Sequence, residues 1–294
     1  MKLNAKEIRN RAAIAKELAR ACKLCPNECD INRWDGTAGY CKLNGQTLIA
    51  SAFPHHGEEP PIRGHGGSGT LFFAGCNLLC DFCQNYSISH KIEGTAVSAE
   101  ETAGIMLRLQ SQGCENINFV SPSHVIHHIL EALAIATERG LALPIVYNSG
   151  GYDSVDALRL LDGIVDIYMP DFKFWSPETA QKLTGAEDYP EMAQAAVKEM
   201  HRQVGDLITN DRGVALRGLL IRHLVLPNGL ADTFEVMRFL HDEVSPGIHV
   251  NIMGQYHPCY KAHEIPEINR AVTQAEVQEA LQAARQAGIR FFVE

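Results

Sequence analysis

The chain has 294 residues, of which 46% are hydrophobic and 21% charged, and its formal net charge is −9. This length suffices for one large domain or a barrel with a small appendage, and the negative charge argues against nucleic acid as the main partner. No apolar run approaches the roughly 20 residues of a membrane span, and the N-terminus lacks the apolar core of a signal peptide. We therefore expect a cytoplasmic protein whose nine cysteines, too few for a disulfide scaffold, are reduced metal ligands.

The N-terminal part of the chain contains a group of four cysteines. An amphipathic pattern predicts a helix near residues 4–21, and Cys22, Cys25, Cys29 and Cys41 follow it. Four thiolates in a short, loop-rich segment fit a tetrahedral metal site, which would stabilise a region with little core of its own. We expect a structural staple here rather than an electron relay. Zinc is the first interpretation, and a mononuclear iron or a second iron–sulfur cluster are the alternatives.

The rest of the chain alternates strands with helices. Residues 54–69, rich in Pro, Gly and His, are expected to form an ordered loop that leads to the first strand of the sheet. The expected boundary between an N-terminal segment (1–54) and a second domain (55–294) lies at the start of this loop. Apolar runs predict six strands, at residues 70–74, 116–120, 144–148, 165–169, 219–226 and 249–253. Amphipathic patterns predict helices near residues 99–113, 124–139, 153–161, 187–205, 230–244 and 273–287. The alternation predicts an α/β fold, an incomplete (β/α)6 TIM-like barrel with parallel strands and its chemistry at their carboxyl ends.

Three more cysteines come directly after the first predicted strand. Cys76, Cys80 and Cys83 have the spacing C-x3-C-x2-C, and Gly75 before them allows a sharp turn. A [4Fe–4S] cluster normally takes four cysteine ligands, so three would leave one iron open to another ligand. Phe82, between the last two cysteines, can shield such a cluster from water. The alternatives are a zinc knuckle, which would need a fourth ligand close by, or a set of core cysteines.

The spacing, the preceding strand and Phe82 resemble the signature of the radical S-adenosylmethionine (SAM) superfamily. More narrowly, residues 20–294 are similar to relatives of the pyruvate formate-lyase activating enzyme, in the subgroup with an N-terminal Cys-x2-Cys-Pro-x2-Cys segment. The run His257-Pro-Cys-Tyr-Lys-Ala is also typical of that subgroup. The resemblance implies that SAM chelates the open iron and is cleaved reductively to methionine and a 5′-deoxyadenosyl radical. It also implies an external electron donor such as flavodoxin or ferredoxin.

The resemblance extends to charged residues at two strand ends. The run Tyr168-Met-Pro-Asp-Phe-Lys173 is similar to the Met-x-Asp-x-Lys of the activating enzymes, which implies that Asp171 and Lys173 lie near SAM and the substrate. Lys173 supplies a point charge suited to the SAM carboxylate. Arg222 matches the arginine of the family's Arg-x-Val-x-x-Pro, and its planar donor fork suits a carboxylate or ribose hydroxyls. We predict Lys173 and Arg222 as catalytic residues; an exposed Asp171–Lys173 ion pair of little energetic value is the alternative.

Further polar residues are predicted to bind SAM or a cation. Asn148 and Ser149 are similar to an Asp-Thr pair of the activating enzymes. In those enzymes the pair and two residues of the next strand hold a monovalent cation, and the two matching residues here are Met169 and Asp171. The neutral amide of Asn148 replaces an anionic side chain and weakens such a site. The Gly-Gly-Glu stretch that meets the SAM amino group in the family is absent, and the residues expected to take its place are Ser121 and Ser123.

The predicted function is that of a radical SAM enzyme that removes a hydrogen atom from a glycine of a partner protein, a glycyl-radical enzyme. The absent Gly-Gly-Glu stretch and the extra four-cysteine segment leave open an enzyme that modifies a small molecule or a peptide. A non-catalytic iron–sulfur or zinc electron carrier is the third hypothesis; it would have no affinity for SAM. Glu58 and Glu59, upstream of the cysteine motif, could place a carboxylate over the barrel mouth, although a pair of loop glutamates is more often solvated.

Overall fold

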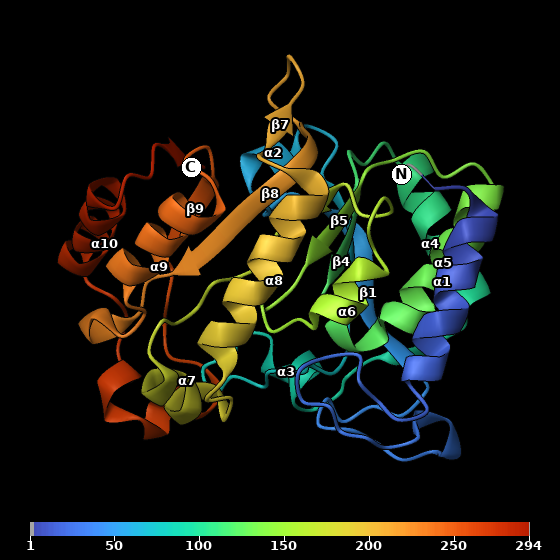
Figure 1. Cartoon of the computed structure of the whole chain (residues 1–294), viewed down its shortest axis with the longest axis horizontal. Coiled ribbons are helices and arrows are strands. Elements are labelled where there is room, and N and C mark those ends of the chain that lie inside the picture. Colours follow the sequence, from blue (N-terminus) through green and yellow to red (C-terminus); the bar gives the residue numbers. More distant parts are fainter. Residues whose placement is uncertain (1–2, 294) are drawn as a thin grey trace.

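The structure is a computed structural model that describes residues 3–293 (Figure 1). Within these residues the strands are β1 (Thr47–His55), β2 (Ser68–Phe73), β3 (Thr95–Val97), β4 (Ile117–Val120), β5 (Ile145–Asn148), β6 (Ile167–Tyr168), β7 (Ile208–Thr209), β8 (Ala215–Leu224), β9 (His249–Met253) and β10 (Phe291–Phe292). They form one sheet in the order β10-β9-β8-β6-β5-β4-β2-β1-β3, and β7 pairs with β8 beside this path.

The six predicted strands form the parallel part of this sheet. β2, β4, β5, β6, β8 and β9 are neighbours in chain order, and every pair between them is parallel. The order runs from β10 to β3 without closing, so the barrel is incomplete, as predicted. Because the strands are parallel, their carboxyl ends meet at one edge, where the loops can converge on a site.

Helices pack around the sheet. They are α1 (Ala5–Leu18), α2 (Pro60–Arg63), α3 (Tyr86–Ser89), α4 (Ala99–Ser111), α5 (Ile126–Glu138), α6 (Val155–Arg159), α7 (Pro177–Thr184), α8 (Tyr189–Val204), α9 (Thr233–Phe239) and α10 (Gln274–Gln286). Capping boxes set the starts of α1, α4 and α10. In Figure 1, α1, α4 and α5 lie together on one side of the molecule, and α9 and α10 lie on the other. Within residues 3–293, none of the helices combines the length and apolar character that a membrane crossing requires.

The prediction of a loop over residues 54–69 is wrong in part. β1 extends to His55, α2 follows, and β2 already begins at Ser68. β1 is antiparallel to β2, with Phe53 opposite Thr70 and Pro54 opposite Gly69. Pro54 is tolerated because it lies next to the end of the strand. The domain boundary expected at residue 54 falls inside β1, and the division into two domains stays a prediction.

The four-cysteine segment is folded against the carboxyl-end edge of the barrel. Its loops lie below α1 and beside α3 (Figure 1). The Asn27 side-chain amide donates to the carbonyl of Asn77 at 2.6 Å, and the Lys42 ammonium donates to the carbonyl of His90 at 3.0 Å. The first hydrogen bond joins the segment to Asn77, between the cysteines of the second group, and the second joins it to His90, which follows them in the chain.

Candidate active site

The second group of cysteines lies on a loop that leaves β2, residues 74–85, called here the cysteine loop. The loop turns at Gly75, whose φ of +80° favours glycine; a Cβ there would meet the Cys41 carbonyl oxygen at 2.7 Å. This contact makes glycine the residue that fits where the loop passes the four-cysteine segment. Cys76, Cys80 and Cys83 all line one cavity of about 240 Å³.

The other walls of this cavity come from the carboxyl ends of neighbouring strands. They carry six of the seven polar residues predicted for SAM or a cation, which are Ser121, Asn148, Ser149, Asp171, Lys173 and Arg222. Ser123 is the exception, because its hydroxyl donates to Asp153 at 2.6 Å, outside the residues that line the cavity. Its predicted contact with SAM has no support in this geometry. The structure thus brings the three thiols and six predicted polar residues to one place.

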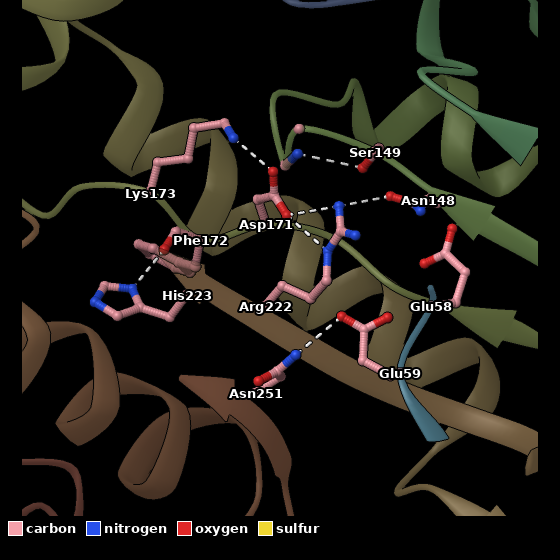
Figure 2. A network of polar contacts seen from close by, with 12 residues as sticks. Glu58, Glu59, Asn148, Ser149, Asp171, Phe172, Lys173, Arg222, His223 and Asn251 are labelled. Atoms are coloured by element: carbon pink, nitrogen blue, oxygen red, sulfur yellow. Dashed lines mark hydrogen bonds and ion pairs between the residues drawn. The ribbon is translucent and has the colours of Figure 1, made fainter. Parts of the chain in front are cut away.

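Asp171 links two cations at the centre of the cavity wall (Figure 2). Its carboxylate accepts from the Lys173 ammonium at 2.5 Å and from Nε of Arg222 at 2.9 Å. Nη2 of Arg222 donates to Oδ1 of Asn148 at 2.8 Å. The three charged side chains are only 13–19% exposed, so the alternative of an exposed ion pair does not apply.

The electrostatics of this network keep all three groups charged. Burial alone would raise the pKa of the Asp171 carboxyl, but Arg222 and Lys173 outweigh it and hold the pKa below its ordinary value. Burial would likewise lower the pKa values of Lys173 and Arg222, and the charge of Asp171 instead raises both. A permanent pair of cations therefore faces the cavity, suited to an anionic group of a ligand.

Three of the four positions predicted for a monovalent cation already have side-chain partners. Oδ1 of Asn148 accepts from Arg222, and the Ser149 hydroxyl donates to Asp153 at 2.5 Å. Asp171 is occupied by its two cations, and Met169 is fully buried in an apolar cluster. The arrangement thus uses Arg222 where a bound cation was expected.

The chemistry of the three cysteines fits an iron–sulfur cluster. Burial raises the pKa values of the Cys76 and Cys80 thiols, and Lys173 opposes this effect in both. The backbone N–H of Leu78 donates to Sγ of Cys76 at 3.4 Å, and Sγ of Cys83 lies 3.2 Å from the Ser89 hydroxyl. Thiolates in such a buried place need a cation to balance them, and iron–sulfur clusters are among the metal centres that soft sulfur ligands select. Three cysteines lining one cavity supply the ligand set of a cluster with one open iron.

The four cysteines of the N-terminal segment also lie near one another. Cys22, Cys25 and Cys41 are buried, whereas Cys29 is partly exposed. Burial raises the pKa of the Cys25 thiol to about 12, and the neighbouring Cys41 and Cys22 add to this shift. Across residues 3–293, no three Cys, His, Asp or Glu side chains meet in the geometry that holds a single metal ion. The metal of this segment therefore stays a prediction.

Sequence reasoning ranked two residues of the site as weak candidates. For Glu58 and Glu59 a solvated position was favoured over one at the barrel mouth, yet they are only 9% and 7% exposed. They line a second cavity of about 370 Å³, which shares Asn148 and Arg222 with the first. The only local signal was the Pro60-Pro61 pair, which is typical of a helix start and places Glu59 at the N-cap of α2. The pairing of β1 with β2, which the sequence did not reveal, carries both carboxylates inward.

Comparisons with known proteins agree with this geometry. The family model "Radical SAM superfamily" matches residues 70–225, which include all three cysteines of the cysteine loop and Arg222. The uncharacterized protein MJ0674 of Methanocaldococcus jannaschii is 33% identical over 279 residues, covering 92% of this chain and 76% of the relative. The uncharacterized protein MJ0808 of the same organism is 22% identical, covering 83% of this chain and 73% of the relative.

Two solved structures share the fold. A radical SAM methyltransferase from Sphaerobacter thermophilus matches with a TM-score of 0.51 and 17% identity, over 76% of this chain and 66% of that one. HydG, a maturase of the [FeFe]-hydrogenase, matches with a TM-score of 0.51 and 14% identity, over 98% of this chain and 62% of that one. The chain thus spans slightly less than two thirds of either structure, and at these identities the likeness concerns the fold alone. Since the family model covers more than half of the chain, including the cysteine loop and the strands β4 to β8, the chain belongs to the radical SAM superfamily.

Proposed function

We propose that this chain is a radical SAM enzyme in which Cys76, Cys80 and Cys83 hold a [4Fe–4S] cluster. One observation carries the proposal: the three thiols and the Asp171–Lys173–Arg222 network line the same cavity. The thiols would supply three of the four cluster ligands, and the open iron would face the charged wall. The family to which the chain belongs supports both the cluster and SAM as its cofactors.

The residues around the cavity would bind and orient SAM. When bound, the cluster and SAM supply a 5′-deoxyadenosyl radical, formed with one electron from a donor such as flavodoxin or ferredoxin. Lys173 and Arg222 would bind the SAM carboxylate or ribose hydroxyls, while Asp171 holds both cations in position. Phe82 is 4% exposed and packs edge-on against Phe174, with ring centroids 5.9 Å apart, so it keeps water from this side of the cavity.

The first substrate we propose is a glycine of a partner protein, a glycyl-radical enzyme, from whose α-carbon a hydrogen atom moves to the 5′ carbon. The similarity of residues 168–173 to the activating enzymes supports this choice. A small molecule or a peptide is the second candidate. The 370 Å³ cavity beside the cysteines favours it, because that volume lies within the range of small-ligand pockets.

The test of the cofactor assignment compares two cysteine substitutions. Cys80→Ala removes a proposed cluster ligand, whereas Cys114→Ala alters a cysteine that is equally buried but lies outside the cavity. After anaerobic reconstitution, iron and 5′-deoxyadenosine are measured with dithionite and SAM. We expect Cys80→Ala to lose about four irons and all cleavage, and Cys114→Ala to keep both. Cleavage retained by Cys80→Ala would refute the assignment.

The two substrate candidates are separated by fractionating a cell extract. The dialysed protein fraction and the dialysable small molecules are added separately to the reconstituted enzyme. A protein substrate should raise 5′-deoxyadenosine formation only with the first fraction, and a small molecule only with the second. Protein labelled with α-deuterated glycine should transfer deuterium to 5′-deoxyadenosine if the proposed glycine is the hydrogen donor.

A further inference from the structure

The second cavity extends the proposed SAM site into a chamber with its own polar end. It shares Asn148, Arg222 and Met253 with the cysteine-lined cavity, so the two spaces adjoin along the Arg222 side chain. Figure 2 shows the carboxylates of Glu58 and Glu59 on the side of Arg222 away from Lys173. None of the roles proposed above uses these two carboxylates.

Both carboxylates are held in place by side-chain amides. Oε1 of Glu58 accepts from Nδ2 of Asn118 at 3.1 Å and lies 3.4 Å from Nδ1 of His55. Oε1 of Glu59 accepts from Nδ2 of Asn251 at 3.0 Å. Each amide comes from a barrel strand, so the carboxylates are fixed by the rigid part of the fold. Such preorganisation is typical of a binding site rather than of a mobile loop.

One carboxylate oxygen is left without a partner. Glu59 is 7% exposed and lines the chamber, yet its Oε2 makes no hydrogen bond within the described residues. Arg222, whose charge interacts with Glu59, directs its hydrogen bonds to Asp171 and Asn148 instead. A buried carboxylate oxygen without a donor is unfavourable, which indicates a place where a ligand supplies one.

The charges of the chamber do not balance. Two carboxylates, those of Glu58 and Glu59, line the second cavity with one permanent cation, Arg222, which leaves one negative charge in excess (two minus one) when His55 is counted as neutral. Burial raises the pKa of Glu58 and Arg222 opposes this rise, while Glu59 adds to it through its charge and through a side-chain hydrogen bond between the two carboxyl groups. The chamber therefore takes up either a proton or a cation. An organic ammonium would supply both the missing charge and a donor for Oε2 of Glu59.

We propose that Glu59, supported by Glu58, binds a positively charged amino or guanidino group of the substrate. This inference rests on the proposed function and names the chemistry of its substrate. A protonated amine would donate to Oε2 of Glu59 and supply the missing charge, while the rest of the substrate extends toward the cysteines. The cation can belong to a small molecule or to a lysine or arginine side chain of a peptide, since both present the same group.

The test measures binding of two probes with the same butyl chain, one with a charged ammonium group and one with a neutral hydroxyl. n-Butylammonium and n-butanol are titrated into the reconstituted protein with SAM present, and binding is followed by ligand-observed NMR. We expect the ammonium to bind at least about tenfold more tightly, the factor that one charge-assisted hydrogen bond supplies. Equal binding of the two probes would overturn the proposal, whatever the variants show.

Variants then locate the site. Glu59→Gln keeps the shape of the side chain and should reduce ammonium binding about tenfold or more, and Glu58→Gln should have a smaller effect. Glu187→Gln, at an exposed position, is the control and should bind as the wild type does. Thermal unfolding of each variant shows that it is folded. If Glu59→Gln does not fold, Asn251→Ala leaves the carboxylate in place but removes its orienting amide, and it should weaken binding by a smaller factor.

Two further arms complete the experiment. A lysine-containing pentapeptide that binds more tightly than n-butylammonium assigns the cation to a peptide, and the reverse order assigns it to a small molecule. Binding of Mn²⁺ that Glu59→Gln abolishes would overturn the proposal in favour of a metal site. SAM cleavage is measured on the same samples. Loss of cleavage would contradict the proposed function, whereas loss of amine selectivity with cleavage intact would contradict this inference alone.

Discussion

Asp171→Asn tests whether the charged wall of the cavity is a buried, mutually dependent network. The substitution keeps the shape of the side chain and removes its charge. It leaves Lys173 and Arg222 next to each other without the carboxylate that both contact at 2.5–2.9 Å. Their side chains are 13% and 19% exposed, so water cannot replace the lost partner effectively. Removing one partner of a buried ion pair destabilises proteins by about 3–5 kcal/mol.

We expect Asp171→Asn to lower the free energy of unfolding by about 3 kcal/mol, the lower end of that range, because Glu58 and Glu59 partly balance Arg222. The assay is anaerobic urea unfolding followed by circular dichroism. The matched control is Asp156→Asn, which breaks a 2.8 Å pair with Arg159 whose side chains are 63% and 81% exposed. Exposed pairs contribute little, so this variant should change the free energy by less than about 1 kcal/mol.

Equal effects of Asp171→Asn and Asp156→Asn would refute the reasoning. Such a result would mean that solvent reaches the network, or that Glu58 and Glu59 compensate Arg222 completely. Compensation by the two glutamates can be told apart from solvent access, because only compensation makes Glu58→Gln strongly destabilising in the Asp171→Asn variant. A double-mutant cycle on these two positions measures that coupling directly.

Two predictions concern other parts of the molecule. Cys25→Ser should lower metal content and thermal stability while leaving part of the SAM cleavage if the N-terminal site is structural; abolished cleavage in a folded variant would instead indicate a redox role. The second concerns His223, fully buried between the Phe172 carbonyl and the Thr233 hydroxyl, where burial lowers its pKa from 6.5 to about 4. The unfolded chain therefore binds a proton on His223 at a higher pH than the folded chain does. Neutral His223 makes its full contribution to the free energy of unfolding above pH 6.5, and this contribution falls by about 3 kcal/mol as the pH is lowered to 4. Unfolding measured across this range should show the difference between wild type and His223→Gln narrowing as the pH falls; a constant difference would contradict the assignment.

The sequence alone determined the parts of this protein that depend on local pattern. Each of the six parallel strands is a short apolar run between helical patterns, and such runs predict buried strands without knowledge of their partners. The spacing of Cys76, Cys80 and Cys83 is likewise local, because one loop carries all three ligands. Parallel strand order placed the carboxyl ends of the strands at one edge, and the resemblance to the activating enzymes then implied that Asp171, Lys173 and Arg222 lie there near SAM.

Tertiary structure decided what depends on pairing across the chain. β1 is placed between β2 and β3 by contacts that no local pattern shows, and this pairing buries Glu58 and Glu59 next to Arg222. The partner of Asn148 is 74 residues away in the chain, and Asn251 meets Glu59 across 192 residues. A carboxylate on an exposed loop and a carboxylate inside a barrel have the same sequence signal. Only the fold removes the second kind from water. That removal leaves the unpaired charge from which we infer a cationic substrate.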